Sequence, residues 1–269
     1  PSRAEGLRRL GAFLHKAGKY YTENRNYDLG PLNRSNVSEL SPYLRLRLIT
    51  EKELVSAVIS EHKFSEAKKF VEEVCWRTYW KGWLEHRPQV WKKYLQEISY
   101  QKQEIEQKPA LYDLYIKAIN GQTNIKAFDF WVKELVAHGY LHNHARMWFA
   151  SIWIFTLRLP WVLGAEFFFH HLFDGDPASN TLSWRWVAGL HTNGKSYIAK
   201  ADNIYRFTGA RFNPQNQLNE EVQVPPFFDE PIKEKIFPAK NNFNSLNLKN
   251  VVILITEEDL TPEFWPLPQ

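Results

Sequence analysis

Charged and amide side chains occur within one of the most apolar stretches of the chain, residues 140–190, which holds five tryptophans and the single methionine. These side chains are Asn143, Arg146, Asp174, Asp176 and Asn180. A buried charge needs a partner, and an unpaired polar group is costly beside apolar surface. We therefore expect Arg146 to pair with Asp174 or Asp176. Two carboxylates, a guanidinium and an amide around an aromatic pocket suit a large, planar ligand that forms hydrogen bonds.

Helices must position these groups. The apolar residues predict two helices, over 143–157 and 162–173, separated by Pro160, which cannot continue a helix. The Asp-Gly-Asp-Pro sequence at 174–177 predicts a turn, and a third helix is expected to start near Ala178. The polar residues then fall on the first helix, on the turn and on the third helix.

The rest of the chain is also expected to be mainly helical, from its periodicity and capping residues. The expected helices cover 3–22, a segment opened by Ser41 and Pro42, 51–60 after a Thr50 cap, 65–87 up to Pro88, 109–120 and 127–138. The run VVILIT at 251–256 is the only convincing strand pattern. The sequence therefore predicts an all-α fold with one isolated strand near the C-terminus.

Three segments are expected. Residues 1–221 form the helical domain, and 222–250, with four prolines, form a linker or strap. Residues 251–269 read as the first strand and turn of a truncated α/β domain. The net charge of +4 permits an anionic partner without requiring one. The single Cys75 excludes an internal disulfide and favours a reducing cytoplasm, and we expect a monomer without a membrane span or a metal site.

The order HNHARM, PW and DGDPASNTLSWRW resembles the flavin-binding half of the DNA photolyase/cryptochrome family. That family carries HN-x-x-R-M, a lone Trp, and then DGD-x-x-x-N-x-x-x-W-x-W at the same spacings. The resemblance implies a helical FAD-binding domain with FAD as cofactor. It also implies light-driven repair of cyclobutane pyrimidine dimers in DNA, by electron transfer from reduced flavin to a flipped-out dimer. An α/β antenna domain, separate or downstream, is a further expected partner.

The segment VSELSPYLR resembles the family's TSRLSPYLR, whose amides and hydroxyls hold the cofactor diphosphate. Val37 and Glu39 depart from the pattern, and Glu39 places a negative charge near phosphates. Without the downstream motif, an ordinary helix N-cap is the favoured interpretation. In full, the resemblance implies cofactor contacts from Tyr21, Ser38, Leu40, Ser41, Phe70, Arg77, Arg146, Asp174, Asp176 and Asn180.

The segment EEVCWRTYW resembles the family pattern ExxWRExY, and RFNPQNQ resembles FNPxxQ. A charged pair within an aromatic stripe is otherwise most often a solvated edge. The resemblance implies contacts with DNA or the lesion from Arg25, Glu73, Trp76, Asn143, His144, Met147, Trp186 and Gln217. Relatives that repair (6-4) photoproducts have His at the positions of Asn143 and Met147, so this chain is similar to the cyclobutane type.

The family passes electrons to the flavin along three tryptophans. Trp184 matches the proximal one and Trp161 the middle one, whereas the third position falls near Lys108. Another aromatic residue must therefore donate at the surface. The alternatives are Tyr112, Tyr115, Trp148 and Trp153.

Three functions remain open from the sequence. Asn180 favours the repair enzyme, because plant and animal cryptochromes tend to carry Asp or Cys at that position. The second is a cryptochrome-like flavin photoreceptor that has lost repair. The third is a helical protein whose tryptophans serve only as core.

Overall fold

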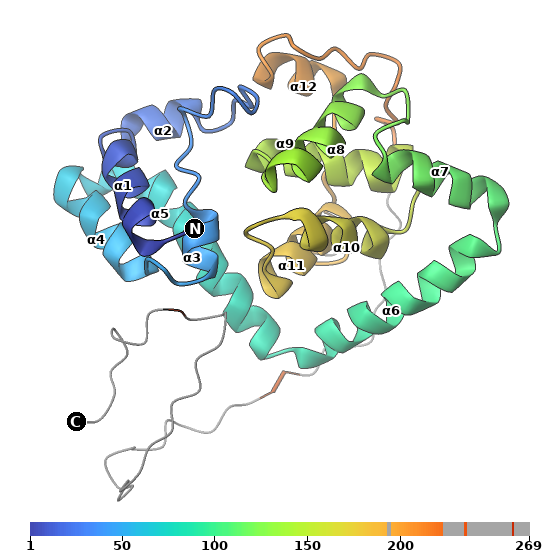
Figure 1. The fold of residues 1–269 in the computed structure, drawn as a ribbon, viewed down its shortest axis with the longest axis horizontal. Helices are drawn as coiled ribbons and strands as arrows, with labels where there is room; N and C mark the ends of the chain where they lie inside the picture. Colours follow the sequence, from blue (N-terminus) through green and yellow to red (C-terminus); the bar gives the residue numbers. More distant parts are fainter. Residues whose placement is uncertain (193–194, 223–233, 236–259, 261–269) are drawn as a thin grey trace, which may run out of the picture.

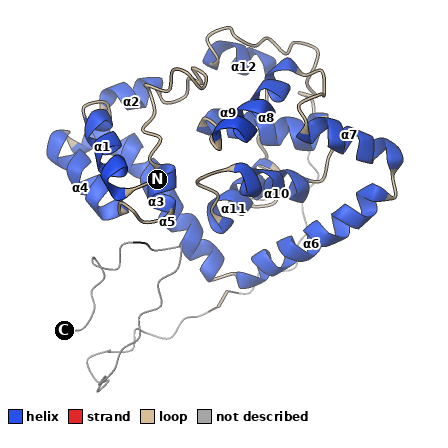
Figure 2. Ribbon diagram, in the orientation of Figure 1, coloured by secondary structure: helices blue, strands red, loops and turns tan. Residues whose placement is uncertain are grey.

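A computed structural model describes residues 1–192, 195–222, 234–235 and 260. The described part is helical and contains no strand (Figure 2), so the all-α expectation is confirmed. The helices are α1 (Arg3–Leu14), α2 (Lys19–Asn24), α3 (Ser41–Arg45), α4 (Glu51–Glu61), α5 (Phe64–Glu85), α6 (Pro88–Glu106), α7 (Pro109–Ile119), α8 (Lys126–His138), α9 (Asn143–Ser151), the π-helical turn η1 (Ile152–Thr156), α10 (Trp161–His171), α11 (Pro177–Val187) and α12 (Ala201–Phe207). The expected strand at 251–256 and most of the expected 222–250 segment lie outside the described residues.

Local signals set most helix boundaries. Thr50 and Glu53 form a capping box at the start of α4, with each side chain bonding the other residue's backbone amide. Proline occupies the first position of α6, α7 and α11, where an N–H would have no acceptor within the helix. Gly139 ends α8 with φ 61, a left-handed conformation that favours glycine. These helices therefore begin and end where the chain itself provides a cap.

Three segments differ from expectation. The amphipathic segment 3–22 forms two helices, α1 and α2, because the chain turns over residues 15–18. Pro88 ends α5, but it also begins the 19-residue α6, which was not expected. The predicted helix over 143–157 ends in the π-helical turn η1.

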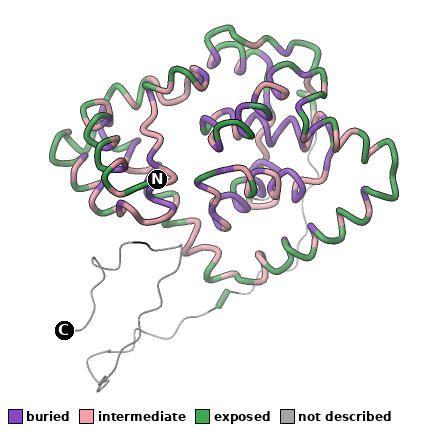
Figure 3. Tube along the Cα trace, in the orientation of Figure 1, coloured by how far each residue is buried: buried purple, intermediate pink, exposed green. Residues whose placement is uncertain are grey.

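Two hydrophobic cores organise the helices (Figures 1 and 3). The first core lies among α1, α3, α4 and α5, drawn blue to cyan in Figure 1, and includes Phe13, Leu54 and Phe70. The second is larger, draws on α6 to α12, and includes the fully buried Trp131 and Trp153. Since α5 packs against both α2 and α11, it connects the two cores. None of the described helices is long and apolar enough to cross a membrane.

Polar contacts from the loop after α2 join the cores. The carboxylate of Asp28, 2% exposed, accepts hydrogen bonds from the Gly30 amide at 3.0 Å and the Trp131 indole at 3.1 Å, and pairs with Arg211 at 2.9 Å. Arg34 pairs with the buried Glu134 of α8 at 2.7 Å. A buried carboxylate is tolerated only when it is paired and hydrogen-bonded in this way.

His142 fixes the start of α9. Its Nδ1 accepts the His144 amide at 3.1 Å, which leaves the proton on Nε2, where it is donated to the Arg25 carbonyl at 3.0 Å. The ring is 3% exposed, and burial lowers the pKa of His142 to about 4. Protonation would place a second N–H against the His144 amide, so the folded state requires the neutral ring.

We expect the free energy of unfolding to fall as pH falls from about 6.5 towards 4. In that window the unfolded chain binds a proton at His142 that the folded chain does not, which costs up to about 3 kcal/mol. His142→Asn keeps a capping oxygen and should remove much of this dependence, although His144 retains a share because burial also lowers its pKa. Urea unfolding at pH 7 and pH 5 measures the effect, with exposed His138→Asn as control. Identical pH dependence in wild type and His142→Asn would contradict it.

Candidate functional site

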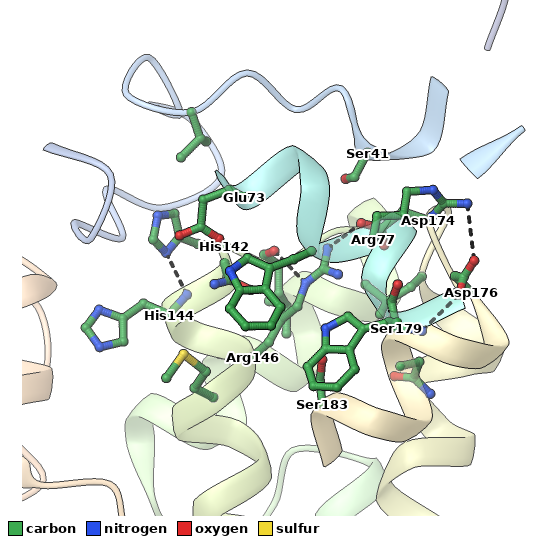
Figure 4. A pocket seen from close by; sticks show the side chains of 18 of the residues that line it. Ser41, Glu73, Arg77, His142, His144, Arg146, Asp174, Asp176, Ser179 and Ser183 are labelled. Carbon is green, nitrogen blue, oxygen red and sulfur yellow. Dashed lines mark hydrogen bonds and ion pairs between the residues drawn. The ribbon is translucent and has the colours of Figure 1, made fainter. Parts of the chain in front are cut away.

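A cavity of about 830 Å³ lies between the two cores. This volume falls within the ~300–1,000 Å³ typical of sites for small molecules and cofactors. Its walls come from α2, the segment 37–44, α5, the start of α9, and α11 with the turn before it. The residues assigned from the sequence to cofactor binding, electron transfer or DNA binding all line this cavity, except Trp161 and Gln217. Figure 4 shows many of them converging from these elements.

The Arg146–Asp174 pair lies on one wall of the cavity (Figure 4). The Arg146 Nη2 contacts Asp174 Oδ2 at 3.0 Å, and its Nε donates to the Leu141 carbonyl at 2.9 Å. Of the two partners expected for Arg146, the structure therefore has Asp174. The second oxygen, Asp174 Oδ1, is buried and has no hydrogen-bond partner among the described residues. A ligand that donates a hydrogen bond would satisfy it.

Asp176 caps α11. Its Oδ1 accepts the amides of Ala178 and Ser179, both at 2.9 Å, as an N-cap aspartate does. Its Oδ2 faces Arg77 Nη2 of α5 at 3.2 Å and Lys81 Nζ at 3.9 Å. The carboxylate thus holds α11 against α5 at the cavity, and it keeps the Arg77 guanidinium on the cavity wall.

Asn180 is buried one turn into α11. Its Nδ2 donates to the Ala165 carbonyl of α10 at 2.7 Å, so its Oδ1 is the group left to accept from a ligand. The neighbouring Ser179 hydroxyl is buried, lines the cavity and has no partner among the described residues. Together with Asp174 Oδ1, these groups form an incomplete set of buried polar contacts along one side of the cavity.

Tyr140 was not identified from the sequence. Its ring lies between two guanidinium groups, Arg34 at 4.6 Å and Arg146 at 5.3 Å from the ring centroid. Burial raises the pKa of Tyr140 above its usual range, so the phenol stays neutral. Tyr140 directly precedes the LHNHARM motif, but only the fold shows that two arginines distant in sequence meet on it.

Glu39 is the residue whose charge was unexpected beside phosphates. One of its oxygens contacts Arg34 at 2.9 Å and the other contacts Arg9 at 3.3 Å. It adopts φ 50, a conformation that is costly for a residue with a Cβ. Two guanidinium groups thus pair with Glu39, so its negative charge is compensated within the protein.

The α5 wall combines an ion pair with aromatic rings. Tyr21 packs edge-on against Phe70 at 5.0 Å. Arg25 pairs with Glu73 at 2.8 Å, and burial raises the pKa of the Glu73 carboxyl while Arg25 opposes that rise. Trp76 is 49% exposed, so it does not serve as core. This wall is therefore available to a ligand.

Other parts of the lining, on α9 and α11, carry Asn143, His144, Met147 and Trp186. His144 has both ring nitrogens engaged within the protein, Nδ1 with the Asn26 carbonyl at 2.9 Å and Nε2 with the Tyr197 hydroxyl at 3.3 Å. Its role as a direct DNA contact stays a prediction, because in this structure it makes internal contacts. Gln217 is exposed and lies outside the cavity lining, so its predicted DNA contact belongs to another part of the surface.

Trp184 lines the cavity, while Trp161 lies outside its lining. A Cβ on Gly164 would come within 2.4 Å of the Trp184 ring, so only glycine allows this approach to α10. On the same helix, Trp161 stacks on Tyr94 of α6 at 5.6 Å, and Tyr94 contacts Trp91 at 5.2 Å.

The surface donors considered from the sequence occupy other places. Trp153 contacts Trp184 at 6.3 Å and Tyr115 at 6.0 Å, both edge-on. Trp148 is fully buried, and Tyr112 is exposed on α7. Trp91 and Tyr94 of α6 extend from Trp161 instead. They were not predicted as electron donors from the sequence, because the helix α6 was not expected.

Residues 70–221 match the family described as the FAD binding domain of DNA photolyase. The chain belongs to the DNA photolyase/cryptochrome family. It is 30% identical over 218 residues to the deoxyribodipyrimidine photo-lyase of Thermus thermophilus, covering 81% of this chain and 49% of that protein. It is 31% identical over 246 residues to that of Agrobacterium fabrum, covering 86% and 49%. The chain thus spans about half the length of these photolyase relatives.

Solved structures of the family share the fold. A bacterial class III photolyase from Agrobacterium tumefaciens superposes with a TM-score of 0.61 and 25% identity, over 78% of this chain and 43% of that one. The Synechocystis cryptochrome superposes with a TM-score of 0.59 and 22% identity, over 77% and 43%. Photolyases and cryptochromes therefore both resemble this chain.

The cofactor of this photolyase-family domain is FAD. The cavity fits such a group on its own evidence. It has the volume, it has an aromatic wall on α5, and it has buried polar atoms without partners in the described part of the chain, at Asp174 and Ser179. The guanidinium of Arg77 lines the cavity and suits an anionic diphosphate.

We expect Asp174→Ala to abolish most FAD retention, because the cavity loses an acceptor and Arg146 loses its partner. Flavin absorbance per mole of purified protein measures the effect, and circular dichroism reports folding. Asp113→Ala, which removes a surface carboxylate paired with Lys117, is the matched control. Full flavin occupancy in Asp174→Ala would refute the assignment.

Proposed function

We propose that the chain is part of an FAD-dependent, light-driven enzyme that repairs cyclobutane pyrimidine dimers in DNA. The observation that carries this proposal is one cavity whose lining combines two kinds of side chain. Polar groups come from α9 to α11, at Arg146, Asp174 and Asn180, and the last two are buried. Half-exposed Trp76 on α5 and partly exposed Trp186 on α11 add aromatic rings. The same cavity thus offers contacts for a cofactor and for a flat substrate.

When bound, reduced FAD excited by light supplies an electron to the dimer. The residues of this chain bind and orient. Arg146 and Asp174 fix one another on the cavity wall, while Asn180 offers an acceptor held by its bond to Ala165. Packed aromatic rings exclude water around them. A damaged base pair unstacks at a low energetic cost, so a dimer can leave the duplex for a pocket of this kind.

A cryptochrome-like photoreceptor is the second candidate, favoured by the likeness to the Synechocystis cryptochrome. Support for repair comes from the amide Asn180 and from Asn143 and Met147, which stand where (6-4) enzymes have His. The deciding experiment mixes photoreduced protein with a dimer-containing oligonucleotide under blue light and separates the products by chromatography. Repaired strand supports the enzyme. Flavin photochemistry without repaired strand supports the photoreceptor.

We expect Trp186→Ala and Glu73→Ala each to weaken the preference for damaged over intact DNA more than total DNA binding. Stacking on a flipped base contributes on the order of 1–3 kcal/mol, so the Trp186 effect should be roughly fivefold to a hundredfold. Fluorescence anisotropy with matched oligonucleotides gives the ratio of dissociation constants. Tyr100→Ala, an exposed aromatic on α6, is the control. An unchanged ratio in both variants counts against repair.

Two sets of rings suggest a route by which electrons reach the pocket, Trp184 on the cavity wall and the successive contacts of Trp161, Tyr94 and Trp91. We expect Trp184→Phe nearly to stop photoreduction of the bound flavin with a thiol as external reductant, and Trp161→Phe to slow it strongly. Trp91→Phe should also slow it, because Trp91 lies beyond Tyr94 in the same stack. Loss of oxidised-flavin absorbance under blue light measures each rate. Tyr112→Phe is the control, and a larger effect there than at Trp91 would exclude Trp91 as the donor.

A further inference from the structure

Two parts of the cavity lining carry aromatic rings, the α5 wall and the α11 wall. On the α5 wall, Trp76 stacks on Trp80 with ring centroids 5.6 Å apart and an interplanar angle of 27°. On the α11 wall, Trp186 lines the cavity and is partly exposed. Large rings on an open surface retain rotamer freedom unless neighbouring groups hold them. The contacts that these rings make therefore decide how rigid this part of the lining is.

The segment after α11 supplies one side chain to each wall. Tyr197 stacks on Trp186 at 5.9 Å and 27°, and it does not itself line the cavity. His191, which itself lines the cavity, lies edge-on to Trp80 at 4.8 Å and also contacts Trp83 at 5.0 Å. Two described residues after α11 therefore contact one ring in each wall.

Tyr197 is itself held through its ring, its hydroxyl and its backbone amide. Because His144 Nδ1 faces the Asn26 carbonyl at 2.9 Å, its Nε2 is the acceptor for the Tyr197 hydroxyl at 3.3 Å. His144 is in turn stacked on the buried Trp148 at 4.0 Å. The Tyr197 amide donates to the Val187 carbonyl at 3.2 Å, at the end of α11. The ring behind Trp186 is thus tied to the second core.

We propose that Tyr197 and His191 are positioning residues, a brace that holds the rings of Trp186 and of Trp80 beside Trp76 in a fixed orientation and thereby selects a linked pair of pyrimidines over a single base. This selectivity rests on the proposed function. A preorganised pocket loses little conformational freedom on binding, so it favours the ligand whose shape it matches. A loose wall can close onto any flat base, and the advantage of the dimer then falls.

Binding ratios provide one test. In the full-length chain, Tyr197→Leu should lower the ratio of affinities for dimer-containing over intact single-stranded oligonucleotide by about three- to tenfold, as expected for loss of an aromatic pair. Tyr197→Phe keeps the stack and should retain most of the ratio. His191→Ala should lower it in the same direction. The controls are Tyr205→Leu and His138→Ala, both at exposed positions.

A second readout needs no DNA. Full-length chain labelled with 5-fluorotryptophan gives a Trp186 fluorine resonance, assigned by its absence in Trp186→Phe. This resonance should shift or broaden in Tyr197→Leu, remain close to wild type in Tyr197→Phe, and be unchanged in Tyr205→Leu. An unaltered Trp186 resonance in Tyr197→Leu overturns the brace.

The two readouts separate the brace from the repair function. If wild type discriminates damaged DNA and both Tyr197→Leu and His191→Ala keep its ratio, the brace does not set selectivity and the proposal is overturned. If wild type itself shows no discrimination, the repair function fails, and the fluorine resonance alone decides whether Tyr197 holds Trp186.

Discussion

The buried carboxylate of Asp28 is the contact that ties the loop between α2 and α3 to the second core. That loop leads into the segment 37–44, which lines the cavity, so its attachment also helps to fix a cavity wall. Asp28 accepts from the Gly30 amide of the same loop, and it binds the Trp131 indole and the Arg211 guanidinium, which come from distant parts of the chain. Removing one partner of such a group leaves a buried charge uncompensated. The contact is therefore stabilising only as a complete set.

The carboxylates on the cavity wall follow a different rule. Asp174 uses one oxygen for Arg146 and leaves the other buried without a partner among the described residues. Asp176 uses one oxygen as the cap of α11 and turns the other towards Arg77. Asp28 has both oxygens engaged, whereas Asp174 on the cavity wall keeps one oxygen without a partner in the described part of the chain. A protein tolerates that local cost where a ligand completes the hydrogen bonds.

The sequence predicted what short spacing controls. The helices around Arg146 and Asn180, the turn at Asp174, and the Thr50 cap all follow from residues close in the chain, and the structure has each of them. Contacts between residues far apart in the chain could not be predicted from the sequence. Nothing in the sequence indicates that Arg9 and Arg34 neutralise Glu39, or that Tyr197 stacks on Trp186. The helix α6 was missed because Pro88 was interpreted only as the end of α5, although proline also begins helices.

In this fold, a tryptophan can belong to the hydrophobic core and also contribute to the cavity. Trp184 is 2% exposed and packs so closely on Gly164 that no side chain fits there, yet the same ring lines the cavity. Trp148 is fully buried, yet it supports the His144 ring that holds Tyr197 behind Trp186. Close packing leaves such rings no room to move. A ring that is immobile because it is core is also one that can keep a neighbouring site in a fixed geometry, so the tryptophans of the second core serve the cavity through their packing.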